Sequence, residues 1–257
     1  AFFDQHYPRD ASGNLRFEPS QSLETWWDCV NPLPEIAGLH FVLERLLQLP
    51  ARDVGAVRMA SWQRLRRQLP AIPTKTVQGK RLLAPAEKVG RKSNMENPEL
   101  YAVFPFRIYG VGKPNLVLAR ETFARRLHPG HRGWQQDDTQ AAYLGLTDEA
   151  RRAIVNRFGT KHAGSRFPAF WGPNFDWVPD QDHGANGVMA LQTMLMQCEG
   201  KRILLFPAWP RDWDVEFKLH APYGTTVEGV CRGGRLRRLV VTPPSRRKDV
   251  EIMPFRP

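Results

Sequence analysis

The chain has 257 residues, of which 42% are hydrophobic and 25% are charged, as is typical of a globular protein with one large or two smaller domains. No apolar run reaches the roughly 18 residues of a membrane-spanning helix, so we expect no membrane partner. The net charge is +11, but the arginines are spread as pairs without a nucleic-acid-binding motif. We therefore expect solvated basic surfaces and no nucleic-acid partner.

The cysteines and the first residues bear on the compartment. Cys29, Cys198 and Cys231 are widely spaced and predict free, mostly buried thiols, with a Cys198–Cys231 disulfide as the alternative. The chain begins at Ala1 with a segment that resembles no signal peptide, so we expect a further portion of the protein upstream. The residues alone leave the compartment open.

Helical patterns dominate the first two hundred residues. After an irregular start, a helix is predicted from Asn31, because Leu39, Leu43 and Leu46 recur at helical spacing. Residues 70–92 are rich in Pro, Gly and Lys and predict a long connection, with a strand pair as an alternative for part of it. Further helices are predicted at residues 54–69, 98–109, 115–126, 133–144, 148–158 and 185–198.

After Gly200 the pattern changes to strands, predicted at residues 202–207, 215–220, 226–231, 236–241 and 248–253. Gly233 and Gly234 predict a hairpin turn, because glycine readily adopts a positive φ. We therefore expect a mainly α fold. Helix pairs would form a partial (α/α)6 barrel, an α/α toroid, over residues 1–200, and a small antiparallel β-domain would follow over residues 201–257.

Three segments outside the predicted helices place carboxylates beside aromatic or amide side chains: residues 19–28, 92–101 and 171–184. Sugar-binding sites use both kinds of group, because rings stack on the apolar faces of pyranoses while carboxylates and amides bind hydroxyls or move protons. Functional residues gather on loops at one end of a scaffold. The three segments therefore predict a carbohydrate site.

Glu24 is the first candidate catalytic residue, since it precedes Trp26, Trp27 and Asp28. A carboxyl beside indole rings is partly desolvated, which suits a general acid. The alternative is a carboxylate at the start of a helix that accepts hydrogen bonds from backbone N–H groups.

Residues 176–184 contain three aspartates and a histidine. Asp182 stands just before a predicted helix, so capping is the alternative to catalysis there. Metal binding by Asp180, Asp182 and His183 is a further alternative, but the spacing matches neither a Ca²⁺ loop nor a zinc motif. We expect no metal and no cofactor, because motifs for nucleotides and for nucleophilic serines are also missing from the sequence.

The segments also match known motifs in their order. Ser20-Gln21-Ser22-Leu23-Glu24 resembles Ser-x-Ser-Pro-Glu, and residues 96–105 resemble His-x-Ser-His-Leu-Tyr-x-x-Phe-Pro. Residues 203–210, followed by Arg232-Gly233-Gly234, resemble Leu-Leu-Pro-Ala-Leu-Pro and Arg-Gly-Gly, and this match is the most specific. All of these motifs come from glycoside hydrolase family 95, which contains α-L-fucosidases and α-L-galactosidases.

The resemblance implies an inverting glycoside hydrolase, with Glu24 as general acid and Asp182 in the machinery that activates water. It implies an oligosaccharide or glycoside substrate and a periplasmic or secreted location. It also implies that a missing N-terminal segment or a second chain completes the toroid. Glu96 and Glu99 stand where the family has a histidine pair, so fucose specificity is not carried over.

The residues expected to contact the sugar share an aromatic or polar side chain in these segments: Trp26, Trp27, Asp28, Glu96, Asn97, Glu99, Trp134, Gln135, Trp171, Asp180 and His183. Three other functions stay open. The chain is an inactive or incomplete fragment that serves a larger enzyme as a carbohydrate-binding or structural part, a polyanion-binding module that uses its basic surface, or a transferase or phosphorylase on a similar scaffold.

Overall fold

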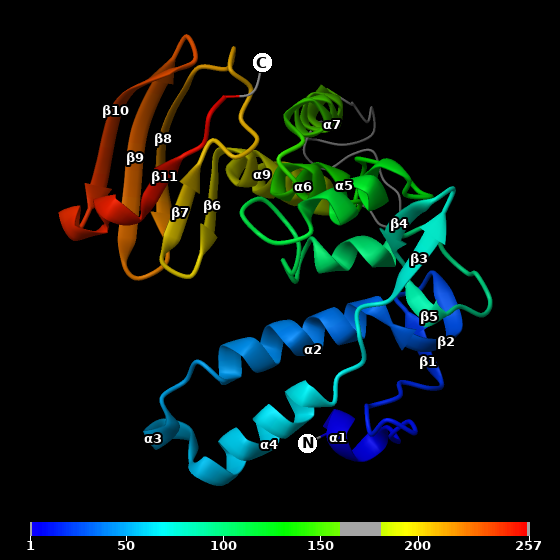
Figure 1. The fold of residues 1–257 in the computed structure, drawn as a ribbon. Helices are drawn as coiled ribbons and strands as arrows, with labels where there is room; N and C mark the ends of the chain where they lie inside the picture. Colours follow the sequence, from blue (N-terminus) through cyan, green and yellow to red (C-terminus); the bar gives the residue numbers. More distant parts are fainter. Residues whose placement is uncertain (1, 160–180, 256–257) are drawn as a thin grey trace. The chain divides into compact units, whose positions relative to one another are not determined.

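The computed structural model of the chain describes residues 2–159 and 181–255. The chain divides into two compact units, residues 1–128 and residues 129–257, and each is described by itself. Figure 1 colours both along the sequence, with the first unit from blue to green and the second from green to red. The predicted boundary after residue 200 stays a prediction.

The first unit is built around helix α2 (Leu33–Leu46), whose neighbours are α1 (Phe2–His6), α3 (Ala51–Val54), α4 (Ala56–Arg67), α5 (Leu116–Ala124) and the 3-10 helix η1 (Pro98–Ala102). The helix predicted from Asn31 is confirmed. It starts just after Pro32, because proline lacks the N–H that helix interiors use and fits only the first turn. Its apolar face packs with α4 in a core of Leu15, Phe17, Ile36, Leu39, Leu43, Leu65 and Leu69.

Two small sheets accompany these helices. Strands β1 (Ser20–Ser22), β2 (Trp26–Pro32) and β5 (Ala86–Lys88) form an antiparallel sheet in the order β1-β2-β5. Strands β3 (Thr74–Val77) and β4 (Lys80–Leu83) form a hairpin, so the strand pair considered for residues 70–92 is confirmed.

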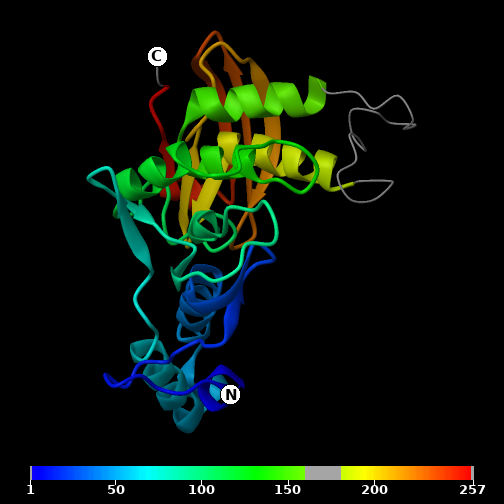
Figure 2. The same cartoon turned by 90° about the vertical axis from the view of Figure 1, so that its right-hand side faces the viewer.

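The second unit begins with three helices that pack against one another, α6 (Asp137–Tyr143), α7 (Thr147–Gly159) and α9 (Asp182–Leu195). Figure 2 shows α7 beside α9. Strand β6 (Met196–Glu199) follows α9 directly and pairs with β7 (Arg202–Leu205).

The last part of the second unit is a meander of β8 (Val215–Ala221), β9 (Thr225–Arg232) and β10 (Arg235–Thr242). The 3-10 helix η2 (Pro244–Asp249) then leads into β11 (Val250–Ile252), which lies parallel to β7. The turn between β9 and β10 is the predicted one, with Gly233 at φ 57° and Gly234 at φ 67°.

The predicted mainly α fold with a partial (α/α)6 barrel is wrong. The structure is mixed, with 38% helix, 25% strand and four small sheets, and its described residues contain no toroid of α-hairpins. Two predicted helices are shorter than expected. The one at residues 98–109 ends after Ala102, ahead of Pro105, whose ring disfavours a helical residue before it. The one at residues 133–144 starts only at Asp137. Residues 26–30, predicted to be irregular, and residues 31–32, predicted to start the helix, form β2.

Two further findings concern the whole described chain. None of its helices combines the length and the apolar character that a bilayer crossing requires. Cys29, Cys198 and Cys231 are in no disulfide, and Cys29 and Cys231 are buried.

Candidate functional site

In the first unit, two glutamates far apart in sequence meet. Glu24 lies in the turn between β1 and β2, and Glu96 lies just before η1. The Glu96 carboxylate oxygen Oε2 accepts hydrogen bonds from the backbone N–H of Glu24 at 3.0 Å and from the Thr25 hydroxyl at 2.9 Å. The Thr25 hydroxyl oxygen in turn accepts the backbone N–H of Glu96 at 2.9 Å. The Asn94 amide donates to Glu24 Oε2 at 3.0 Å. We call Glu24, Thr25, Asn94 and Glu96 the carboxyl cluster.

Two indole rings border the carboxyl cluster. The Trp27 indole N–H donates to the backbone carbonyl oxygen of Glu24 at 3.1 Å, and this side chain is 40% exposed. The Arg91 guanidinium carbon lies 4.9 Å from the centre of the Trp27 ring, and the Lys92 ammonium nitrogen lies 5.9 Å from that of Trp26. The cluster therefore combines carboxyls with an exposed aromatic surface and with cations.

The environments of the two carboxyls differ. Burial raises the pKa of Glu96, and the negative charge of Glu24 adds to the rise, while hydrogen bonds from Thr25 and from the Glu24 backbone oppose it. Glu24 itself is exposed. Two adjoining carboxyls in unlike environments are typical of acid–base pairs in enzymes, because one holds a proton more readily than the other.

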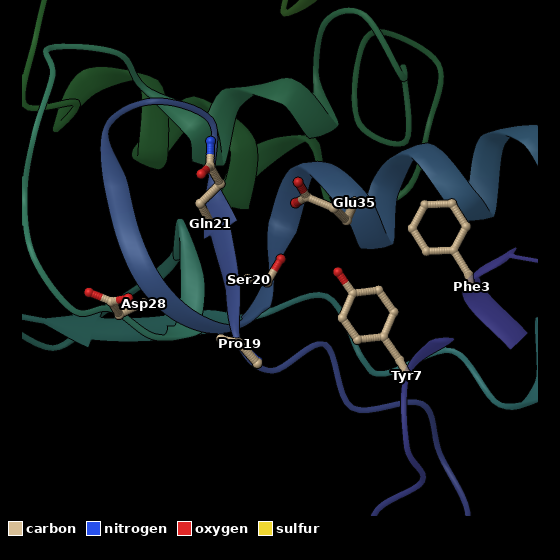
Figure 3. Close-up of a pocket in the computed structure, with 7 residues that line it drawn as sticks. All are labelled: Phe3, Tyr7, Pro19, Ser20, Gln21, Asp28 and Glu35. Carbon is tan, nitrogen blue, oxygen red and sulfur yellow. The ribbon is translucent and has the colours of Figure 1, made fainter. Parts of the chain in front are cut away.

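The other predicted residues of the first unit face inward or elsewhere. The Asn97 amide donates to the His128 carbonyl oxygen at 2.8 Å and its amide oxygen accepts the His128 N–H at 3.1 Å. Glu99 is only 6% exposed, and burial raises its pKa while the charge of Lys75 opposes the rise. Asp28 lines a separate cavity together with Glu35 (Figure 3). Hydrogen bonds therefore connect Glu24 with Trp27 and with Glu96. The other three predicted residues make their contacts elsewhere.

In the second unit, the predicted residues Gln135 and His183 belong to a buried network around Arg157. The guanidinium donates to the backbone carbonyl oxygens of Gly133, Gln135 and His183 and, at 2.6 Å, to the carboxylate of Asp138. The His183 ring nitrogen Nδ1 accepts the Gly133 N–H at 3.2 Å, and Nε2 lies 2.8 Å from the Arg157 carbonyl oxygen. Arg157, Asp138 and His183 are all fully buried, so the network holds the loop before α6 against α7 and α9.

The remaining predicted residues are placed only in part. Trp134 is half-buried in the loop before α6, and Asp182 is exposed at the start of α9. Trp171 and Asp180 lie outside the described residues. Glu24 belongs to the first unit and Asp182 to the second, so their pairing across a substrate stays a prediction.

Two features escaped the sequence analysis. Glu35 was one, although it precedes Leu39 by four residues and so shares the inward face of α2, which is an unusual place for an acid. The pair of Asp138 and Arg157 was the other, and no local pattern indicates it, because both partners sit on helix surfaces that look ordinarily charged.

The described residues contain no group of three or more His, Cys, Asp or Glu side chains placed to hold a metal ion. The metal alternative named Asp180, which lies outside the described residues, so it is not decided by this finding.

No protein-family model matches the chain, and no curated protein matches it either. The resemblance to glycoside hydrolase family 95 therefore stays a prediction.

Proposed function

We propose that the chain is a glycoside hydrolase in which Glu24 protonates the leaving oxygen of a glycoside. The carboxyl cluster supports this proposal, because it sets an exposed carboxyl beside a half-buried one and next to the exposed ring of Trp27. Cleavage of a glycosidic bond uses a carboxyl that gives its proton to the leaving oxygen, and an adjacent ring binds the apolar face of a sugar.

Glu96 acts in this proposal as a positioning residue. Its Oε2 accepts the backbone N–H of Glu24 and so holds the turn that carries the acid. Burial raises the pKa of Glu96, so this carboxyl takes up a proton at a higher pH than an ordinary glutamate does, and protonation weakens the acceptor that holds the turn. The family resemblance gives Asp182 the role of assisting the attacking water, and this role stays a prediction, since Asp182 belongs to the second unit.

The test is a hydrolysis assay of the purified chain on a panel of aryl glycosides and oligosaccharides. We expect Glu24→Gln to lower kcat by at least about 100-fold on oligosaccharides, because general acid catalysis contributes that much or more. We expect less loss on aryl glycosides, whose leaving groups need less protonation. Glu96→Gln should shift the pH profile of kcat, and a merely structural role for Glu96 would leave that profile unmoved.

Glu18→Gln is the matched control. Glu18 is an exposed acid of the same unit that pairs with Arg16 outside the carboxyl cluster, so activity should not change. Undiminished hydrolysis by Glu24→Gln would contradict the proposal. A folded wild-type chain that binds glycans through Trp27 but hydrolyses none would instead support the alternative of a carbohydrate-binding part of a larger enzyme.

A further inference from the structure

The first unit contains a cavity of about 490 Å³ that the carboxyl cluster does not use. Its volume falls within the range of sites for small molecules. Three parts of the unit build it, namely α1 with the residues after it, the sheet of β1 and β2, and the first turn of α2. The lining residues are Phe3, Tyr7, Pro19, Ser20, Gln21, Asp28 and Glu35.

The Glu35 carboxyl is one of the polar groups that line this cavity. Its Oε2 is buried and has no hydrogen-bond donor, and its other contact is with its own backbone N–H. Burial raises the pKa of Glu35 to about 7. A buried acceptor without a donor is unfavourable, so a ligand that brings an N–H group stabilises the site by supplying the missing hydrogen bond.

The charge of the cavity contrasts with that of the chain. Asp28 and Glu35 line it and no Lys or Arg does, although the chain carries 37 basic and 26 acidic residues. The arginines nearest in sequence to the lining residues form salt bridges with other acids, Arg9 with Asp4 and Arg16 with Glu18. Nothing among the lining residues therefore neutralises the two acids.

Aromatic rings and hydroxyls complete the cavity. The rings of Phe3 and Tyr7 are stacked with centroids 6.2 Å apart and planes 18° apart. In Figure 3 the hydroxyls of Tyr7 and Ser20 and the carboxyl of Glu35 point toward the same space, with the Phe3 ring alongside. Rings beside carboxylates are the combination that recognises organic cations, since both attract positive charge while the rings also hold alkyl groups.

We propose that this cavity binds a small organic cation that carries N–H groups, such as a primary alkylammonium. One N–H donates to Glu35 Oε2, the hydroxyls of Tyr7 and Ser20 accept the others, and the alkyl part lies against Phe3 and Tyr7. Asp28 adds long-range attraction from the exposed rim. The site is independent of the proposed glycoside hydrolysis.

The proposal has a pH signature. The titratable groups around Glu35 are Tyr7, whose hydroxyl points toward the same space, and Asp28 and Cys29 on β2, of which the Asp28 side chain does not point toward Glu35 (Figure 3). Asp28 and Glu35 both contribute to the raised pKa of the Cys29 thiol, after burial. Since the cation binds ionised Glu35, and the ionised fraction rises from about 0.1 at pH 6 to about 0.9 at pH 8 for a pKa of about 7, affinity should rise about tenfold over that interval.

Titration calorimetry with three probes of similar size tests the idea at pH 8. n-Butylammonium supplies charge and N–H donors, n-butanol supplies a neutral donor, and tetramethylammonium supplies charge without donors. We expect n-butylammonium to bind at least tenfold more tightly than either other probe and to release protons at pH 7. Glu35→Gln should lower its affinity at least tenfold. Glu44→Gln, an exposed acid of the same helix that pairs with Arg66, should leave it unchanged.

Several results would overturn the proposal. They are equal binding of n-butanol, affinity that does not change between pH 6 and pH 8, and Glu35→Gln binding as the wild type does. Binding of a methyl glucoside that is lost in Glu35→Gln would assign the cavity to neutral sugars instead. Should Glu35→Gln fail to fold, the pH dependence and the proton release of the wild type still decide, since neither needs a variant.

Discussion

The two units treat buried charge differently. In the second unit, the fully buried guanidinium of Arg157 meets the carboxylate of Asp138 and three backbone carbonyl oxygens. In the first unit, burial raises the pKa of Glu35, Glu96 and Glu99, and none of the three forms a salt bridge within the part of the chain that the structure describes.

The difference distinguishes charges that only stabilise the fold from charges that are placed to bind a ligand or to transfer a proton. A buried ion pair with all its hydrogen bonds made is fixed, and breaking it unfolds what it holds. A buried or half-buried acid without a cation has a raised pKa, and groups with such shifted pKa values are frequent at functional sites. The first unit therefore contains the acids that are candidates for chemistry, whereas Arg157 stabilises the second unit.

The largest expected effect is the loss of the buried cation. Arg157→Ala should destabilise the second unit by about 3–5 kcal/mol, because it leaves Asp138 buried without its partner. Hydrogen exchange at the amides of α6, α7 and α9 measures this loss. Arg151→Ala is the matched control. Arg151 makes two 2.8 Å hydrogen bonds to Asp212, but both side chains are exposed and solvent screens their charges, so the loss should be much smaller than for Arg157→Ala. Equal losses of stability in Arg157→Ala and Arg151→Ala would contradict the distinction between the buried and the exposed ion pair.

The second effect depends on pH. The pKa of Glu35 is raised from 4.5 to about 7, so between these values the folded state binds more protons than the unfolded state. Stability contributed by the protonated carboxyl is therefore present below pH 4.5 and is lost as the pH rises through 7, by at most about 3 kcal/mol.

Glu35→Gln removes this titration, so the variant should gain stability relative to the wild type at pH 8 and lose that advantage at pH 5. Urea denaturation at the two pH values measures the difference. Glu44→Gln is the matched control, because Glu44 is an exposed acid of the same helix that pairs with Arg66. A constant offset between Glu35→Gln and the wild type would mean that the carboxyl is solvated after all.

The smallest expected effect tests whether the first unit tolerates buried polar groups that make no hydrogen bond. The Thr122 hydroxyl accepts the Leu83 N–H at 2.9 Å and donates to the Leu118 carbonyl oxygen at 2.8 Å. Thr122→Val leaves the Leu83 N–H buried without an acceptor and should cost about 1–2 kcal/mol in thermal unfolding. Thr122→Ser keeps both bonds and should cost less. If Thr122→Val leaves the thermal stability unchanged, the first unit tolerates unpaired polar groups in general. The acids without a cation would then no longer indicate a functional region.

Local sequence rules predicted the elements that local rules control. The helix predicted at residues 185–198 is present as α9, although it starts at Asp182 and gives way to strand β6 after Leu195, and the predicted Gly233-Gly234 turn is confirmed. β2 was missed, because its residues from Trp26 to Pro32 become a strand only through pairing with β1 and β5. The toroid prediction failed because it required long inner helices, whereas η1 ends after Ala102.

The candidate site shows the same limit. Glu24 and Glu96 were each singled out beside aromatic or amide residues, but no local pattern places them within hydrogen-bonding distance of one another across 72 residues of chain. The cavity around Glu35 escaped entirely, because it is assembled from three segments whose proximity is a property of the fold. Contacts between residues far apart in the chain cannot be predicted from a single sequence.

The parallel pairing of β7 with β11 makes β7 the central strand of its sheet, in the order β11-β7-β6. Ile203 lies opposite Val250, and the Met253 N–H donates to the Leu205 carbonyl oxygen at 2.9 Å. Removal of the residues from Val250 onward would turn β7 into an edge strand with unpaired backbone groups along apolar residues, and such edges pair readily with other chains. A truncated form of the protein is therefore expected to aggregate.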